Sequence, residues 1–202
     1  MCRTVYNKVS WVLVLTVLIF FAGCQEKERV ETNRVLLRTT LGEIELELFP
    51  DKAPISVENF LSYVRSGFYK NVLFHRVVTD FVIQGGGYDK NYTKKETQTP
   101  IKNEANNGLS NLRGTVAWAR TSDVHSATSQ FFINLRDNTR LDYRDSTAAG
   151  YGYAVFGKVI RGMDVVDKIG SVFIGAHHGM RDIPMKPVVI RSAKIVMEEK
   201  KS

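Results

Sequence analysis

Residues 74–87 hold the side chains with the most chemical promise, in the order Phe-His-Arg-Val-Val-Thr-Asp-Phe-Val-Ile-Gln-Gly-Gly-Gly. Two strands joined at the Thr-Asp pair would place Arg76 and Gln84 close to opposite one another. A guanidinium and an amide would then share one face, with Phe81 and Val82 as an apolar floor beside them. Such a face offers hydrogen-bond donors without a nucleophile, which suits binding and electrostatic stabilisation. From residue types alone, a surface charge at Arg76 and a strand filler at Gln84 remain an open alternative.

Other catalytic constellations are missing from the sequence. It contains no Gly-x-Ser-x-Gly, no Walker-type phosphate loop and no His-Glu-x-x-His. The glycines at 85–87 are followed by loop rather than helix, so the pattern predicts a tight turn instead of a phosphate cradle. His177 and His178 are adjacent, and a flexible polar loop is favoured there over a metal site. The sequence therefore predicts neither a metal nor a cofactor.

Composition indicates one folded domain and argues against nucleic-acid binding. The chain has 202 residues, of which 44% are apolar and 10% aromatic. Its 28 Lys and Arg against 21 Asp and Glu give a net charge of +7, but the excess is spread along the chain. The two cysteines, Cys2 and Cys24, lie near the N-terminus, so the rest of the chain can form neither an intramolecular disulfide nor a cysteine-based zinc site.

The N-terminus resembles a bacterial lipoprotein signal. Arg3 and Lys8 precede an apolar run at 11–21, which is shorter than the roughly 20 residues that a membrane span needs. An Ala-Gly pair then precedes Cys24, which in such signals becomes the acylated first residue. The alternative is an uncleaved signal anchor, and the short run argues against it. The predicted organisation is a lipoprotein signal peptide at 1–23, a tether at 24–33 and a folded domain at 34–198.

The sequence of the folded part predicts many short strands and two helices. A hairpin is expected from 35–39 and 43–48, because the second run alternates charged and apolar side chains. Helical spacing, with a proline in the first turn and a glycine at the end, predicts a helix in 52–67, and a shorter one is expected at 163–169. The remaining predicted strands are 73–78, 81–84, 115–119, 130–134, 153–160 and 188–197. About eight strands broken by turns favour a closed or nearly closed antiparallel barrel, since closure removes exposed edges.

Five motifs follow one another through this region. They are Phe-His-Arg-Val at 74–77, Phe-Val-Ile-Gln-Gly-Gly-Gly at 81–87, Gly-Thr at 114–115, Ser-Gln-Phe-Phe-Ile at 129–133 and Val-Phe-Gly-Lys-Val at 155–159. In order and spacing they resemble the motifs of the cyclophilin family of peptidyl-prolyl cis-trans isomerases. The similarity runs from about residue 34 to residue 196, and it is closest to the bacterial periplasmic type.

The resemblance implies a mainly β fold, a closed eight-stranded antiparallel β-barrel capped by two α-helices, with the active groove on the outer barrel face. It implies that the catalytic residues are Arg76, which carries the catalytic guanidinium, together with Gln84 and Phe81. The substrate-binding residues that it implies are Val82, Ala119, Arg120, Gln130, Phe132, Leu141 and Tyr153.

The chain departs from the family pattern at the groove. Arg140 stands where the family usually has an aromatic side chain, which weighs against binding of the inhibitor cyclosporin. Tyr153 stands where many members have His, and Trp118 and Arg120 replace the commoner Met and Asn. None of these departures removes the catalytic arginine.

The activity implied by the resemblance is rotation about the amide bond before proline in polypeptides, without metal, nucleotide or nucleophile. A proline-loop binding module without useful turnover is the alternative, and a purely structural lipoprotein is a third class. The lipid on Cys24 would place a monomeric folding assistant in the periplasm, on the outer rather than the inner membrane because Gln25, not Asp, follows it. The loops at 89–98 and 173–183 are expected to shape substrate preference.

Overall fold

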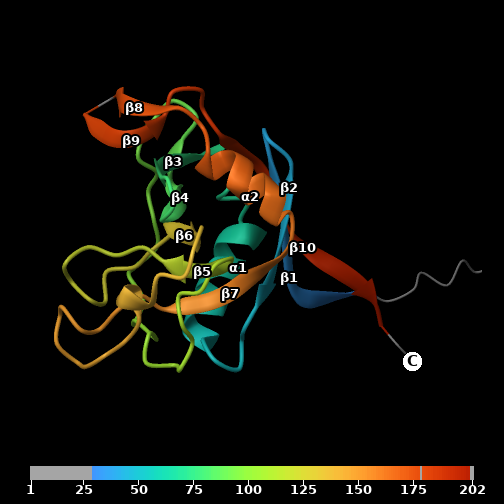
Figure 1. Ribbon diagram of the computed structural model, residues 1–202. Helices are drawn as coiled ribbons and strands as arrows, with labels where there is room; N and C mark the ends of the chain where they lie inside the picture. The colour runs from blue at the N-terminus through green and yellow to red at the C-terminus, as the bar shows by residue number, and fades with distance from the viewer. Residues whose placement is uncertain (1–28, 178, 201–202) are drawn as a thin grey trace, which may run out of the picture.

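The computed structural model describes residues 29–177 and 179–200 (Figure 1). The predicted signal peptide at 1–23 and the predicted acylation site Cys24 lie outside these residues.

Eight antiparallel strands form a closed barrel, as the sequence predicts (Figure 1). Closure pairs β1 with both β10 and β2, so the barrel has no free edge along its main wall. Around the barrel the strands are β1 (Arg29–Thr39), β10 (Val189–Glu199), β3 (Val72–Val78), β4 (Val82–Asp89), β6 (Phe131–Asn134), β5 (Thr115–Trp118), β7 (Val155–Arg161) and β2 (Glu43–Leu48).

Alternation along the strands separates the filled interior from the outer face. In β2, Ile44, Leu46 and Leu48 are fully buried, while the glutamates between them face outwards. This confirms the expected hairpin, because β1 and β2 pair antiparallel with Leu37 opposite Ile44. The same alternation in β3, β4 and β6 decides which side chains can reach a ligand.

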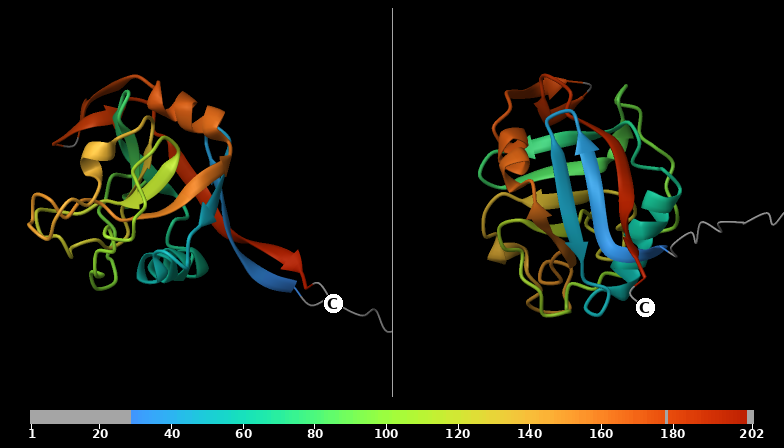
Figure 2. Two further views of the ribbon diagram at one scale, coloured as in Figure 1. Left: turned by 60° about the horizontal axis from the view of Figure 1, so that its bottom comes forward. Right: turned by 90° about the vertical axis from the view of Figure 1, so that its right-hand side faces the viewer.

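Two helices cover opposite ends of the barrel, α1 (Pro54–Arg65) and α2 (Met163–Gly170) (Figure 2). Helix α1 buries Phe60, whose ring lies 5.5 Å from that of Phe131 and 5.3 Å from that of Phe156. The carboxylate of Glu104 accepts the backbone N–H groups of Ile55 and Ser56 and so satisfies orphan donors at the helix start. Both predicted helices are confirmed.

The glycine run at 85–87 is not the predicted tight turn. It continues β4 through a bulged pairing with β3. Gly86 has φ of +91°, and a Cβ there would lie 2.4 Å from the carbonyl oxygen of Ser129. The run therefore marks a close approach of two backbones inside a sheet, a use of glycine that the sequence pattern does not distinguish from a turn.

The segment predicted as a loop at 173–183 instead holds a second small sheet. Strand β8 (Ile174–His177) pairs antiparallel with β9 (Met180–Pro184) outside the barrel. The two strands have only four and five residues, and their apolar and polar side chains show no clear alternation, so the sequence pattern indicates a loop. His177 therefore belongs to a strand, and His178 lies outside the described residues.

Strand β1 begins at Arg29, so the pairing with β10 includes residues that the sequence analysis assigns to the tether. Arg29 pairs with Glu199, and the two strand ends project from the barrel as a ribbon (Figure 2). Arg65 of α1 holds this ribbon through an ion pair with Glu31 at 2.8 Å. The ribbon and the β8–β9 hairpin lie at opposite ends of the molecule (Figure 1).

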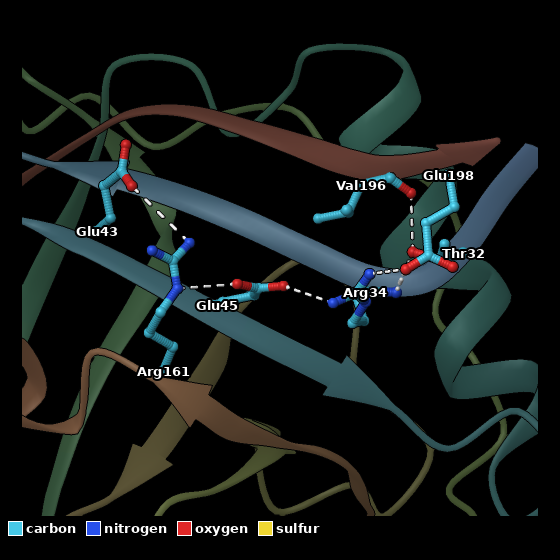
Figure 3. Close-up of polar contacts among 7 residues, drawn as sticks. All are labelled: Thr32, Arg34, Glu43, Glu45, Arg161, Val196 and Glu198. Carbon is cyan, nitrogen blue, oxygen red and sulfur yellow. Dashed lines mark hydrogen bonds and ion pairs between the residues drawn. The ribbon is translucent and has the colours of Figure 1, made fainter. Parts of the chain in front are cut away.

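A charge network crosses the outer face of β1, β2, β7 and β10 (Figure 3). Glu45, only 9% exposed, accepts from Arg161 Nε at 3.0 Å and from Arg34 Nη1 at 3.3 Å. Arg34 also pairs with Glu198, and Arg161 with Glu43 at 4.0 Å. The nearly buried carboxylate thus joins strands on both sides of β2 and stabilises the closed barrel.

Candidate active site

A groove of about 210 Å³ lies on the outer barrel face. Every residue that the sequence analysis assigns to the groove lines it, except Gln130. The lining consists of Arg76, Phe81, Val82, Gln84, Ala119, Arg120, Phe132, Leu141 and Tyr153.

The strand register explains why these side chains converge. Arg76 lies directly opposite Gln84 in the β3–β4 pair, as predicted, and Gln84 lies opposite Phe132 of β6. Because neighbours alternate, Phe131 points into the barrel core while Phe132 joins a separate apolar cluster on the outer face with Val82. The groove floor is thus the outer side of the same strands that enclose the core.

Arg76 brings the only guanidinium of β3 to the groove wall. Its side chain is 38% exposed, and its Nε lies 3.5 Å from Oδ2 of Asp182 on β9. Gln84 is engaged elsewhere, because its Nε2 donates to Oε1 of Gln130 at 2.9 Å. The sequence analysis did not find Asp182, since no local pattern connects a residue of the presumed loop to a strand far away in the chain.

The family departures pack against the groove walls. The Arg120 guanidinium lies 4.8 Å from the centre of the Tyr153 ring, and its Nε donates to the carbonyl of Gly152 at 3.0 Å. Arg140, in the short 3₁₀ helix η1 (Thr139–Leu141), lies 4.7 Å from the centre of the Phe81 ring. Both cations therefore lie over aromatic rings that themselves line the groove.

Gln130 lines an adjoining cavity of about 260 Å³, which shares Gln84, Ala119 and Arg120 with the groove. Lys94 and Lys95 also line it, and the sequence analysis did not assign them to a site. Burial lowers the pKa of Lys95, and the nearby charge of Asp89 opposes this effect. Its ammonium group donates to the carbonyl of Phe68 and lies 4.1 Å from the centre of that ring.

His75 lies on the buried side of β3 next to Arg76. It is 6% exposed, and its ring centre is 4.8 Å from that of Tyr88. Burial lowers the pKa of His75 to about 4, with a smaller lowering from the Arg76 charge. The backbone of Leu73 and the side chain of Gln130 act in the opposite direction. The imidazole is therefore neutral at physiological pH.

No cluster of three or more His, Cys, Asp and Glu side chains that could hold a metal ion occurs in residues 29–177 and 179–200. Within those same ranges no helix is long and apolar enough to cross a membrane.

Comparisons with known proteins agree with this geometry. The family model described as cyclophilin type peptidyl-prolyl cis-trans isomerase matches residues 34–195. Peptidyl-prolyl cis-trans isomerase A of Dickeya dadantii is 50% identical over 183 residues, covering 91% of this chain and 95% of that protein. A peptidyl-prolyl cis-trans isomerase of Streptomyces antibioticus is 56% identical over 164 residues, covering 81% and 99%.

Solved structures place the same barrel in the same family. A cyclophilin type peptidyl-prolyl cis-trans isomerase of Cryptosporidium parvum, crystallised in the presence of the dipeptide Ala-Pro, is 27% identical to this chain. It superposes with a TM-score of 0.69 and covers 82% of this chain and 99% of its own. The family model matches residues 34–195, two bacterial relatives are 50% and 56% identical, and the fold is a closed barrel with a groove on its outer face; the chain belongs to the cyclophilin-type peptidyl-prolyl cis-trans isomerases.

Proposed function

We propose that the groove binds a proline and its preceding amide in an extended polypeptide and that Arg76 stabilises the amide in its twisted form. The observation that carries this proposal is the position of a permanently charged guanidinium beside an apolar floor, opposite Gln84. Phe81, Val82 and Phe132 hold the pyrrolidine ring.

The physical problem is a rotation, in which no covalent bond forms or breaks. The barrier of about 18–20 kcal/mol arises from the resonance that keeps the amide planar. In the twisted transition state the proline nitrogen regains a lone pair, so a donor placed at that nitrogen binds the transition state more tightly than either planar form. Arg76 supplies such a donor, while Gln84 and the backbone near Arg120 bind the carbonyl side.

One hydrogen-bond donor does not lower the rotation barrier enough to explain turnover in milliseconds. Spontaneous exchange takes tens of seconds or more, so turnover in milliseconds requires roughly 10⁴-fold acceleration, or about 5 kcal/mol. A hydrogen bond from a charged group contributes about 1.5–3 kcal/mol. The apolar floor supplies the remainder by anchoring the ring in a partly desolvated site while the preceding carbonyl turns.

The test is the isomerase rate of the Arg76→Ala variant on a short proline peptide. We expect a loss of tenfold or more with an unchanged melting temperature, because Arg76 is partly exposed and lies outside the core. Arg38→Ala, which removes an exposed arginine of β1 away from the groove, is the control and keeps full activity. Equal turnover by Arg76→Ala and wild type would refute the assignment.

A binding module that docks a proline loop without useful turnover is the second candidate. The packing of Arg140 over Phe81 favours it, because a cation on the ring narrows the rim of the groove. Turnover of free peptide separates the two functions. A protein that binds proline peptides and leaves their exchange rate unchanged is a binding module.

We further propose that the isomerase works on proteins folding in the bacterial envelope, tethered by a lipid on Cys24 and directed to the outer membrane. Support comes from the sequence of residues 1–24 and from the position of Arg29 at the tip of the projecting ribbon. We also propose that it acts as a monomer, because the proposed mechanism assigns every role to residues of a single chain. Mass spectrometry of the mature N-terminus should show the lipid, and Cys24→Ser should release an unmodified, water-soluble chain.

A further inference from the structure

The β8–β9 hairpin lies outside the barrel and yet provides a charged partner for the groove. Asp182 of β9 meets Nε of Arg76 at 3.5 Å, and both side chains are partly exposed, at 40% and 38%. No other acidic side chain forms a salt bridge with Arg76 in residues 29–177 and 179–200. The hairpin is therefore more than a connection between α2 and β10.

Asp182 contacts Arg76 at Nε, whereas the two Nη groups carry the other guanidinium donors. The ion pair joins Oδ2 of Asp182 to Nε of Arg76 at 3.5 Å, so it biases the position of the guanidinium and leaves the two Nη groups unoccupied by that contact. Gln84, the residue opposite Arg76, donates to Gln130 instead. The restraint on Arg76 thus comes from the hairpin side, and its donors remain available on the groove side.

The hairpin holds Asp182 in a defined place. The next residue, Ile183, is 1% exposed and anchors β9 to the barrel. At the base of the hairpin the backbone N–H of Met185 donates to the carbonyl of Phe173 at 2.8 Å. Asp182 itself has φ of +59°, a left-handed conformation that Asp and Asn tolerate better than other side chains.

From these contacts we propose that Asp182 is a positioning residue for the isomerase reaction. It holds the Arg76 guanidinium so that the Nη donors face the nitrogen of the bound proline. This inference rests on the proposed role of Arg76. Without Asp182 the long side chain samples other rotamers, and the fraction of molecules with a correctly aimed donor falls.

The test uses Asp182→Asn, which removes the charge but retains the shape and the tolerance for positive φ. We expect kcat to fall roughly threefold or more, in line with the loss of a partly exposed ion pair, with KM little changed. The matched control is Asp80→Asn in the β3–β4 turn. Asp80 is exposed and also has a left-handed backbone, with φ of +55°. The control therefore removes the same charge from a residue in the same backbone conformation. It should keep full kcat.

A double-mutant cycle distinguishes positioning from a structural role. If Asp182 acts through Arg76, Asp182→Asn has no further effect on the residual rate of Arg76→Ala. An equal loss in both backgrounds would overturn the inference, because the effect would then pass through the fold. In a ¹⁵N-labelled sample, Asp182→Asn should also speed solvent exchange of the Arg76 Nε proton, and Asp80→Asn should not.

The outcomes separate this inference from the proposed function. If Arg76→Ala is inactive while Asp182→Asn matches wild type in kcat, the positioning role is wrong and the catalytic role of Arg76 stands. If Arg76→Ala turns over peptide as fast as wild type, both are wrong. A loss of kcat that depends on Arg76, together with faster Nε exchange, supports both.

Discussion

We predict that acid destabilises the fold through protonation of His75 and that the substitution His75→Gln abolishes this part of the pH dependence. The imidazole is 6% exposed, and its pKa falls from the ordinary 6.5 to about 4 in the folded chain, mainly because burial disfavours its charged form. In the unfolded chain it regains the ordinary value. The folded and unfolded states therefore bind different numbers of protons between these two values.

The direction in which the free energy of unfolding changes with pH depends on which state, folded or unfolded, binds the proton. Below pH 6.5 the unfolded chain is protonated at this imidazole, while the folded chain stays neutral until the pH approaches about 4. The free energy of unfolding thus falls as the pH is lowered through this window, and the contribution levels off below it. With about 1.4 kcal/mol per pKa unit, the whole window corresponds to a loss of roughly 3 kcal/mol.

Urea unfolding at half-unit intervals from pH 7 to pH 4 measures this loss. His75→Gln replaces the imidazole by a neutral side chain, so its stability should vary less with pH by that amount, whatever its stability at pH 7. If His75→Gln and wild type lose stability in parallel, the imidazole is not buried in its neutral form and the reasoning fails.

Five further substitutions test the separate roles of the core, the groove and the barrel wall. Phe131→Ala empties the aromatic core and should cost about 3–5 kcal/mol in urea unfolding, whereas Phe132→Ala should stay folded and raise KM roughly tenfold or more. Glu45→Gln should lower the free energy of unfolding by roughly 1–3 kcal/mol because it weakens bonds to two arginines, while the more exposed Glu43→Gln should change it by under about 0.5 kcal/mol. Gly86→Ala should lower the melting temperature by several degrees, since its Cβ would meet a carbonyl oxygen in a left-handed backbone; an unchanged melting temperature would contradict the close approach.

The parts of the site that the sequence predicts are those set by local alternation. Arg76 and Gln84 are opposite each other because a short turn joins their strands and pairs them in sequence order. Barrel closure follows from many short strands that need partners on both edges. The resemblance to known motifs then assigned roles to side chains such as Leu141, whose approach to the groove no periodicity indicates.

The parts that could not be predicted depend on contacts between distant segments. Asp182 reaches Arg76 only because residues after α2 fold back over β3, and two short strands without alternation read as loop. The glycines at 85–87 read as a turn because the constraint that selects them is the backbone at Ser129 on another strand. In both cases the deciding atom belongs to a segment that sequence pattern alone does not bring near.

The groove lies outside the barrel for a physical reason. The interior is filled by aromatic side chains, among them Phe60, Phe131 and Phe156, and it leaves no room for a peptide. A flexible polypeptide also needs a surface open at both ends, which an outer face offers and a closed interior does not. Because consecutive strand residues alternate between the two faces, Phe131 packs in the core while Phe132 lies on the outer face, where we propose that it binds substrate. Substitutions on the outer face can therefore alter substrate preference without emptying the core, which allows positions such as Arg140 to depart from the family pattern while the barrel remains intact.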